Sequence, residues 1–207
     1  MLSMYSCALA IVSFAVFTSA QTVVVVPSKP SLPVPRMEKG LVNGRIYKNS
    51  SIGVELTAAD GLAFGMPELQ GTPGTVPLLV TVTALRKETL FSPRYVMAFY
   101  ADALAYYPEG QRSTDAYMRK VIKGNRQTGY EVVQENLSAS FGGVAFARSD
   151  FRGALYEAVL VRSCDAQALV FIFASSGKDT VDKLIGGTNL KLDSELSGCH
   201  SADAVSK

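Results

Sequence analysis

The apolar run Ala168-Leu169-Val170-Phe171-Ile172-Phe173-Ala174 decides the fold class of this chain. The run is rich in β-branched and aromatic residues, which favour strands. It has no polar position that could face water, so a strand formed here has to be covered on both faces. The sequence therefore predicts a central strand in a sheet, with further layers packed above and below it.

Other strands are predicted on the N-terminal side of this run. Short stretches of alternating or β-branched residues mark them at 44–49, 52–57, 78–85, 95–101, 130–134, 143–148 and 154–162. A polar turn joins the first two strands, which is typical of a hairpin. The segment 65–77 is rich in proline and glycine and predicts a loop.

Two segments have helical periodicity. Between residues 113 and 124, apolar side chains recur at the spacing of a helix buried on one side, with Ser113 or Thr114 as the cap at its start and Gly124 at the expected end. A second helix is predicted from Ser176 to Ile185, which begins with a capping-box pattern. Strands and helices in this order predict an α+β fold with a largely antiparallel sheet covered by helices.

The first 20 residues predict a signal peptide. They contain no charged side chain, and the apolar run 8–17 is too short to span a bilayer alone. Thr18-Ser19-Ala20 supplies small residues for a signal peptidase, which places cleavage before Gln21. The alternative is an uncleaved anchor that continues through residues 23–26. With cleavage, we expect a protein exported to the periplasm or the extracellular space, without a stable membrane span.

The remaining chain divides into three parts. Residues 21–41 are a proline-rich linker, because closely spaced prolines favour an extended, semi-rigid chain. Residues 42–196 predict a single α+β globular domain, whose size suits one hydrophobic core. Residues 197–207 predict a flexible C-terminal tail.

The charge balance indicates which partners to expect. Twenty basic and 18 acidic side chains leave the chain close to neutral, which gives no reason to expect a nucleic-acid partner. Arg119 and Lys123 share a face of the predicted first helix and Arg126 follows its predicted end, and the three form a candidate partner-binding strip. The alternative is that they are cations near the helix C-terminus, where they interact favourably with the helix dipole.

The residue types argue against common catalytic chemistries. The only histidine, His200, lies in the polar C-terminal segment, whereas serine and cysteine hydrolases usually need a histidine base. Transition-metal sites need several His or Cys ligands, and no phosphate-binding glycine loop occurs. We therefore expect no catalytic residue, cofactor or metal. A pair of carboxylates far apart in the chain is left open.

Cys164 and Cys199 predict a disulfide bond. Removal of the signal peptide takes Cys7 with it and leaves an even number of cysteines in an oxidising compartment. Cys164 follows a predicted strand and Cys199 follows the last predicted helix, so the bond would fix the C-terminal segment to the rim of the sheet. The alternative is one buried free cysteine and one in a disordered tail.

The order of several short motifs resembles the PsbP-like family. The motifs are Gly44-Arg45-Ile46-Tyr47-Lys48-Asn49 with Ile52-Gly53-Val54, then Gly142-Gly143-Val144-Ala145-Phe146-Ala147-Arg148, then Tyr156-Glu157-Ala158-Val159-Leu160-Val161 and the apolar run. The family includes extrinsic subunits of photosystem II and many secreted bacterial proteins, and it shares its fold with a eukaryotic Ran-binding protein. Relatives often carry a Pro-x-x-Trp-like turn where this chain has Gly61-Leu62.

The resemblance implies a PsbP-like α+β fold and a binding or assembly role, and it assigns no site residue. We therefore expect an exported, non-enzymatic binding module with an envelope or extracellular protein as its partner. The alternative is a carrier that encloses a small apolar ligand between sheet and helices. An enclosed apolar cavity would favour the carrier, and convergent carboxylates in a cleft would favour an enzyme.

Overall fold

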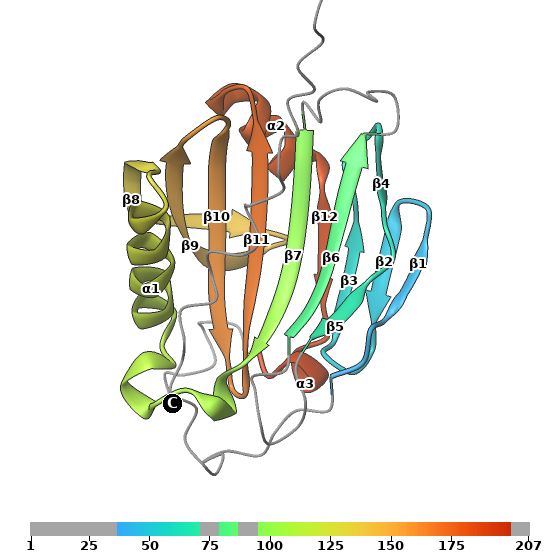
Figure 1. Ribbon diagram of the computed structural model, residues 1–207. Helices are drawn as coiled ribbons and strands as arrows, with labels where there is room; N and C mark the ends of the chain where they lie inside the picture. Colours follow the sequence, from blue (N-terminus) through green and yellow to red (C-terminus); the bar gives the residue numbers. More distant parts are fainter. Residues whose placement is uncertain (1–36, 71–78, 87–94, 200–207) are drawn as a thin grey trace, which may run out of the picture.

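A computed structural model describes residues 37–70, 79–86 and 95–199 of the chain. In this part, two antiparallel sheets pack against helices (Figure 1), which confirms the predicted α+β class. The predicted signal peptide, most of the predicted linker and His200 lie outside the described residues.

The large sheet has the strand order β4-β6-β7-β11-β10-β9-β8, and β5 pairs with β6 beside β4. Its strands are β4 (Leu62–Phe64), β5 (Glu68–Gln70), β6 (Leu79–Arg86), β7 (Tyr95–Ala103), β8 (Glu131–Phe141), β9 (Val144–Arg152), β10 (Tyr156–Cys164) and β11 (Gln167–Ser175). The apolar run forms most of β11, which lies between β7 and β10 as the sequence predicts. β5 lies inside the segment that was predicted to be a loop, because pairing with β6 supplies hydrogen bonds that the local sequence does not indicate.

The small sheet has the order β1-β2-β3-β12. Its strands are β1 (Leu41–Asn43), β2 (Ile46–Asn49), β3 (Val54–Thr57) and β12 (Asn189–Leu192). The predicted hairpin forms β2 and β3. The fourth strand, β12, was not predicted from the sequence, and it returns to pair with β3 after the last long helix.

The helices are α1 (Thr114–Gln127), α2 (Lys178–Gly187) and α3 (Ser194–Ser197), with short 3-10 turns η2 (Leu104–Tyr106) and η3 (Glu109–Gln111). The Ser113 side chain caps α1 by accepting a hydrogen bond from the Ala116 N–H, as predicted. The predicted end at Gly124 is wrong, because the helix continues to Gln127. A glycine inside a helix costs only about 1 kcal/mol, and packing of α1 on the sheet compensates for this cost.

Two hydrophobic layers cover the two faces of the large sheet. Between the sheets, Phe171 of β11 contacts Phe99, Phe141 and Phe146, with ring centroids 4.8, 5.0 and 5.5 Å away. On the other face, Met118 of α1 is fully buried in a cluster that includes Val170 of β11. The side chains of β11 therefore alternate between two covered faces, which explains why its sequence has no polar position.

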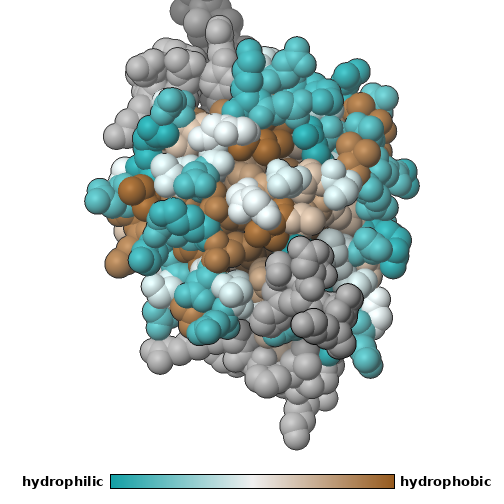
Figure 2. Space-filling view, turned by 180° about the vertical axis from the view of Figure 1, so that it is seen from behind, coloured by the Kyte–Doolittle hydropathy of each residue, from teal (hydrophilic) through white to brown (hydrophobic). Residues whose placement is uncertain are grey.

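The outer face of the small sheet is mixed in character. Leu41 and Ile46 are 80% and 43% exposed there. Lys48, Glu55 and Lys191 lie side by side on β2, β3 and β12, and both lysines form ion pairs with Glu55. Seen from behind, the molecule has hydrophobic residues in the middle of the face and hydrophilic residues around them (Figure 2).

Candidate functional site

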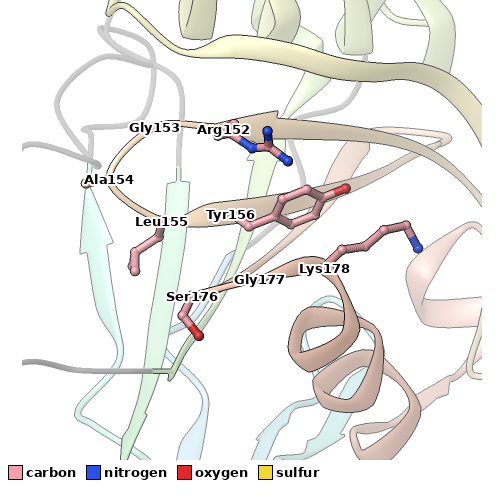
Figure 3. A pocket seen from close by; sticks show the side chains of 8 residues that line it. All are labelled: Arg152, Gly153, Ala154, Leu155, Tyr156, Ser176, Gly177 and Lys178. Carbon is pink, nitrogen blue, oxygen red and sulfur yellow. The ribbon is translucent and has the colours of Figure 1, made fainter.

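A cleft with a volume of about 270 Å³ opens at one end of the large sheet, between the β9–β10 turn and the start of α2. Residues 152–156 form one wall, and Ser176, Gly177 and Lys178 form the other. Figure 3 shows the side chains of Arg152, Tyr156 and Lys178 extending in the same direction, with Tyr156 between the two cations. Three elements therefore contribute to the cleft: the end of β9, the start of β10 and the start of α2.

Two glycines shape the walls of the cleft. A Cβ atom at Gly153 would lie 2.7 Å from the ring of Tyr130, so this turn packs against Tyr130 only because residue 153 lacks a side chain. Gly177 precedes α2, and a Cβ atom there would meet nothing within 4 Å. The space beside Gly177 is therefore open, and a ligand can approach the backbone closely.

An ion-pair network fixes the wall behind the cleft. Asp150 is fully buried and accepts hydrogen bonds from Nε of Arg148 at 2.7 Å and from the hydroxyl of Tyr156 at 2.8 Å. Arg148 also forms an ion pair with Asp182 of α2 at 2.7 Å, and Lys178 forms one with Asp182 at 2.5 Å. The network therefore attaches the start of α2 to the sheet and holds the Tyr156 ring in place.

The same contacts determine the pKa values of two side chains in this wall. Burial raises the pKa of Tyr156 to about 12, so its hydroxyl remains a neutral donor to Asp150. Burial also disfavours ionisation of Asp182, but hydrogen bonds from Lys178 and Arg148 outweigh it and lower the pKa of this carboxyl. Asp182 is therefore ionised at neutral pH and neutralises part of the positive charge at the cleft.

Glu131 of β8 lies opposite Arg152 in the sheet, and Arg152 supplies a further positive charge beside the cleft. Its side chain is exposed at the end of β9, and no described residue forms an ion pair with it. Lys178 is also exposed and shares its charge with Asp182. The arrangement can therefore receive an anionic group between a free guanidinium and a partly neutralised ammonium.

A second cluster of titratable groups lies between β7 and α1. Asp102 is 6% exposed and accepts hydrogen bonds from the hydroxyls of Tyr107 and Tyr117, the latter at 2.7 Å. Nζ of Lys120 donates to the Tyr107 hydroxyl at 2.9 Å and lies 4.3 Å from the centroid of that ring. Burial raises the pKa of Asp102 and lowers the pKa of Lys120.

Tyrosine hydroxyls from neighbouring parts of the chain donate to each of three buried carboxylates. Glu157 is 3% exposed and accepts a hydrogen bond from Tyr130 at 3.0 Å, as Asp150 does from Tyr156 and Asp102 from Tyr117. Each carboxylate thus has its own phenol donor. Such pairs hold elements together and are an ordinary way to bury a carboxyl group.

The predicted strip on α1 is only partly free. Arg119 and Lys123 are exposed, and Arg126 forms an ion pair with Glu135 of β8. Its role in partner binding stays a prediction. Arg152 could not be singled out from the sequence, because its neighbour Lys178 lies on a different element and each residue alone is an ordinary exposed cation.

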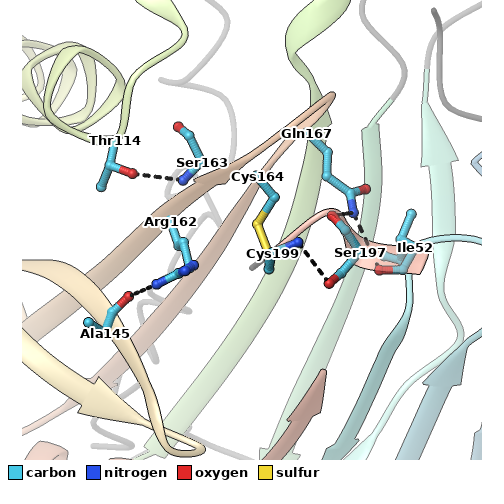
Figure 4. The surroundings of a disulfide bond; sticks show 9 residues. All are labelled: Ile52, Thr114, Ala145, Arg162, Ser163, Cys164, Gln167, Ser197 and Cys199. Atoms are coloured by element: carbon cyan, nitrogen blue, oxygen red, sulfur yellow. Dashed lines mark hydrogen bonds between the residues drawn. A yellow bond between two sulfur atoms is a disulfide. The ribbon is translucent and has the colours of Figure 1, made fainter. Parts of the chain in front are cut away.

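The structure joins Cys164 and Cys199 in a disulfide bond, with the Cα atoms 4.7 Å apart (Figure 4). Beside it, the Gln167 side chain donates hydrogen bonds to the carbonyl oxygens of Ile52 and Ser197. Ser197 and Cys199 are buried, so the start of the predicted flexible tail belongs to the folded domain. Residues 200–207 lie outside the described residues.

Two classes of feature are absent from the described part of the chain. In residues 37–70, 79–86 and 95–199, no group of three or more His, Cys, Asp or Glu side chains could hold a metal ion. Among the same residues, no helix has both the length and the apolar character needed to cross a membrane.

Comparisons with known proteins concern the fold. No protein-family model and no curated protein matches the sequence. One similar solved structure is cyanobacterial PsbP (CyanoP) from Synechocystis sp. PCC 6803, with 12% identity and a TM-score of 0.43 over 73% of this chain and 95% of that chain.

A second similar structure is a protein from Bacteroides thetaiotaomicron VPI-5482, with 9% identity and a TM-score of 0.39. The match covers 75% of this chain and 49% of the other, so this chain spans about half the length of the Bacteroides protein.

Proposed function

We propose that this chain is an exported, non-enzymatic binding or assembly module for an envelope or extracellular protein. The observation that carries the proposal is the open cleft, in which the guanidinium of Arg152 has no ion-pair partner among the described residues. An exposed, unneutralised cation in a cleft suits contact with a partner's polar surface.

The interior supports a binding module over a carrier. Phe99, Phe141, Phe146 and Phe171 occupy the space between the two sheets and contact one another at ring distances of 4.8 to 5.9 Å. An apolar ligand enclosed there would have to displace these rings, and close-packed interiors resist such insertion.

The disulfide supports export. A Cys164–Cys199 bond forms and persists in oxidising compartments outside the cytoplasm. We expect protein recovered from the exported fraction to begin at Gln21. N-terminal sequencing that gave Met1 would overturn cleavage and indicate a retained anchor.

Native mass spectrometry of the protein purified from its own cells tests the binding function. We expect two masses, that of the mature chain alone and that of a stoichiometric complex with a second protein. The complex should form again when the two purified proteins are mixed. Detection of a tightly bound apolar small molecule on the chain would contradict the proposal and would favour the carrier function. Failure of the purified components to reassociate would also contradict it.

A further inference from the structure

We infer that the cleft between the β9–β10 turn and α2 binds a carboxylate-bearing segment of a peptide, with Arg152 and Lys178 as the residues that contact the carboxylate. This inference deepens the proposed function and rests on it, because it names the chemistry of the partner's contact. It follows from the size of the cleft, its charge and the shape of its walls.

The size of the cleft fits a single side chain or chain terminus. Its volume is about 270 Å³, whereas pockets for drug-sized ligands measure about 300–1,000 Å³. A ligand with one acidic group inside the cleft and the remainder outside it satisfies this limit. A peptide meets this requirement, because its acidic side chain can enter while its backbone runs across the rim.

The charge of the cleft selects a carboxylate. The Arg152 guanidinium is planar and can donate two parallel hydrogen bonds to one carboxylate. The Lys178 ammonium has three N–H donors, and Asp182 forms its one ion pair among the described residues. A carboxylate in the cleft within reach of both side chains therefore finds donors from both walls.

The donors behind the cleft are already committed. Arg148 and Tyr156 both donate to Asp150. Asp182 lies against Lys178 and Arg148, and these two cations offset the repulsion that it exerts. Arg152 has Glu131 as its cross-strand neighbour but forms no ion pair among the described residues, so its guanidinium can donate to the ligand.

The walls permit the approach of a peptide backbone. Gly177 adjoins open space, and Gly153 and Ala154 bring little or no side chain to the opposite wall. Leu155 supplies apolar surface at the same turn. An acidic residue followed by an apolar one therefore fits the order of charge and apolar surface along the cleft.

Nuclear magnetic resonance titration of the mature protein, labelled with ¹⁵N, tests this site. The probe is an acetylated, amidated Asp-Leu-Asp-Leu peptide, and its matched control is the Asn-Leu-Asn-Leu peptide. We expect the acidic probe to shift the amide signals of Gly153, Ser176 and Gly177 and the Nε signal of Arg152. The neutral probe should shift them at least tenfold less at equal concentration.

Variants of exposed residues assign the contact. Arg152→Gln combined with Lys178→Gln should weaken binding of the acidic probe at least tenfold, while the amide spectrum of the β11 core stays unchanged. Lys183→Gln provides the matched control, because Lys183 is an exposed lysine on the same helix outside the cleft. This control variant should bind the probe as tightly as the unaltered protein does.

Four results would overturn the inference. The first is equal binding of the acidic and neutral probes, and the second is unchanged binding by the double variant. The third is a set of shifts centred on Arg119 and Lys123 of α1. The fourth is inorganic phosphate that displaces the probe and binds more tightly, which would mark a free-anion site. A protein partner found by native mass spectrometry would still support the proposed function after any of these results. The inference and the proposed function can therefore fail independently of each other.

Discussion

Tyrosine hydroxyls hold the buried carboxylates of this domain. Asp102, Asp150 and Glu157 each accept at least one such bond, and the donors come from α1, from the residues flanking it and from β10. A carboxyl group buried against phenols without a direct cation ionises reluctantly, which is why burial raises the pKa of Asp102 and Glu157. Asp150 also accepts a hydrogen bond from Arg148.

The pH dependence of stability tests this arrangement at Asp102. Its pKa is higher in the folded than in the unfolded state, so its stabilising contribution is complete below the ordinary value of 3.8 and is lost as pH rises through the folded pKa. The groups that face it are Tyr100 on its own strand, Tyr107, and Tyr117 and Lys120 of α1. In Asp102→Asn this loss should be absent.

Urea unfolding of both proteins from pH 3.5 upward measures the effect. We expect the difference in unfolding free energy, unaltered protein minus Asp102→Asn, to fall as pH increases. A difference that grows with pH would indicate that the Lys120 ammonium outweighs burial and that the carboxylate is favoured in the folded state.

Gly142 closes the edge of the sandwich at the β8–β9 turn. Its φ is +60°, and a Cβ atom there would lie 2.5 Å from the Leu190 carbonyl oxygen of β12. Gly143 has φ of +77° and no neighbour within 4 Å. Gly143→Ala should therefore cost about 1–3 kcal/mol through backbone strain alone, and Gly142→Ala should cost clearly more.

Chemical unfolding of the two alanine variants checks this difference. Equal losses of unfolding free energy would mean that the β8–β9 turn does not pack closely on β12. A larger loss in Gly143→Ala would contradict the account of this edge.

At the scale of elements, the disulfide and Gln167 attach the C-terminal segment to the end of β10 and β11. The two cysteines are 35 residues apart in the sequence. In the chain-entropy model, closing a loop of this size stabilises a fold by about 3–4 kcal/mol. Replacing both cysteines by alanine should lower the unfolding free energy by about this amount.

Reduction of the unaltered protein provides the control for the double variant. Reduction and the double substitution should lower the melting temperature to a similar extent, because each removes the Cys164–Cys199 bond. Detection of two free thiols in the exported, unreduced protein would contradict the bond itself.

The elements differ in how far their sequences predict them. β11 was predictable because its apolar run has no polar position, and α1 because its cap and periodicity agree. β12 has only four residues, and pairing with β3, far away in the sequence, makes it a strand. The cleft was not predictable for a similar reason, since Arg152 ends β9 and Lys178 begins α2, and only the fold brings these two ends together.

At the scale of the whole molecule, the two helices pack on opposite faces of the large sheet (Figure 1). Arg119 and Lys123 are exposed on α1, and Lys178 of α2 lines the cleft. A partner that uses the cleft therefore approaches the α2 side. This separation allows one experiment to distinguish the surfaces.

Lysine-reactive cross-linking of the intact complex, followed by mass spectrometry, tests the central claim most directly. We predict that acidic segments of the partner protein are linked through neighbouring lysines to Lys178, and that adding an excess of the Asp-Leu-Asp-Leu peptide removes these links. Links that concentrate on Lys123 of α1 and persist in the presence of the peptide would contradict the claim that the cleft is the binding site.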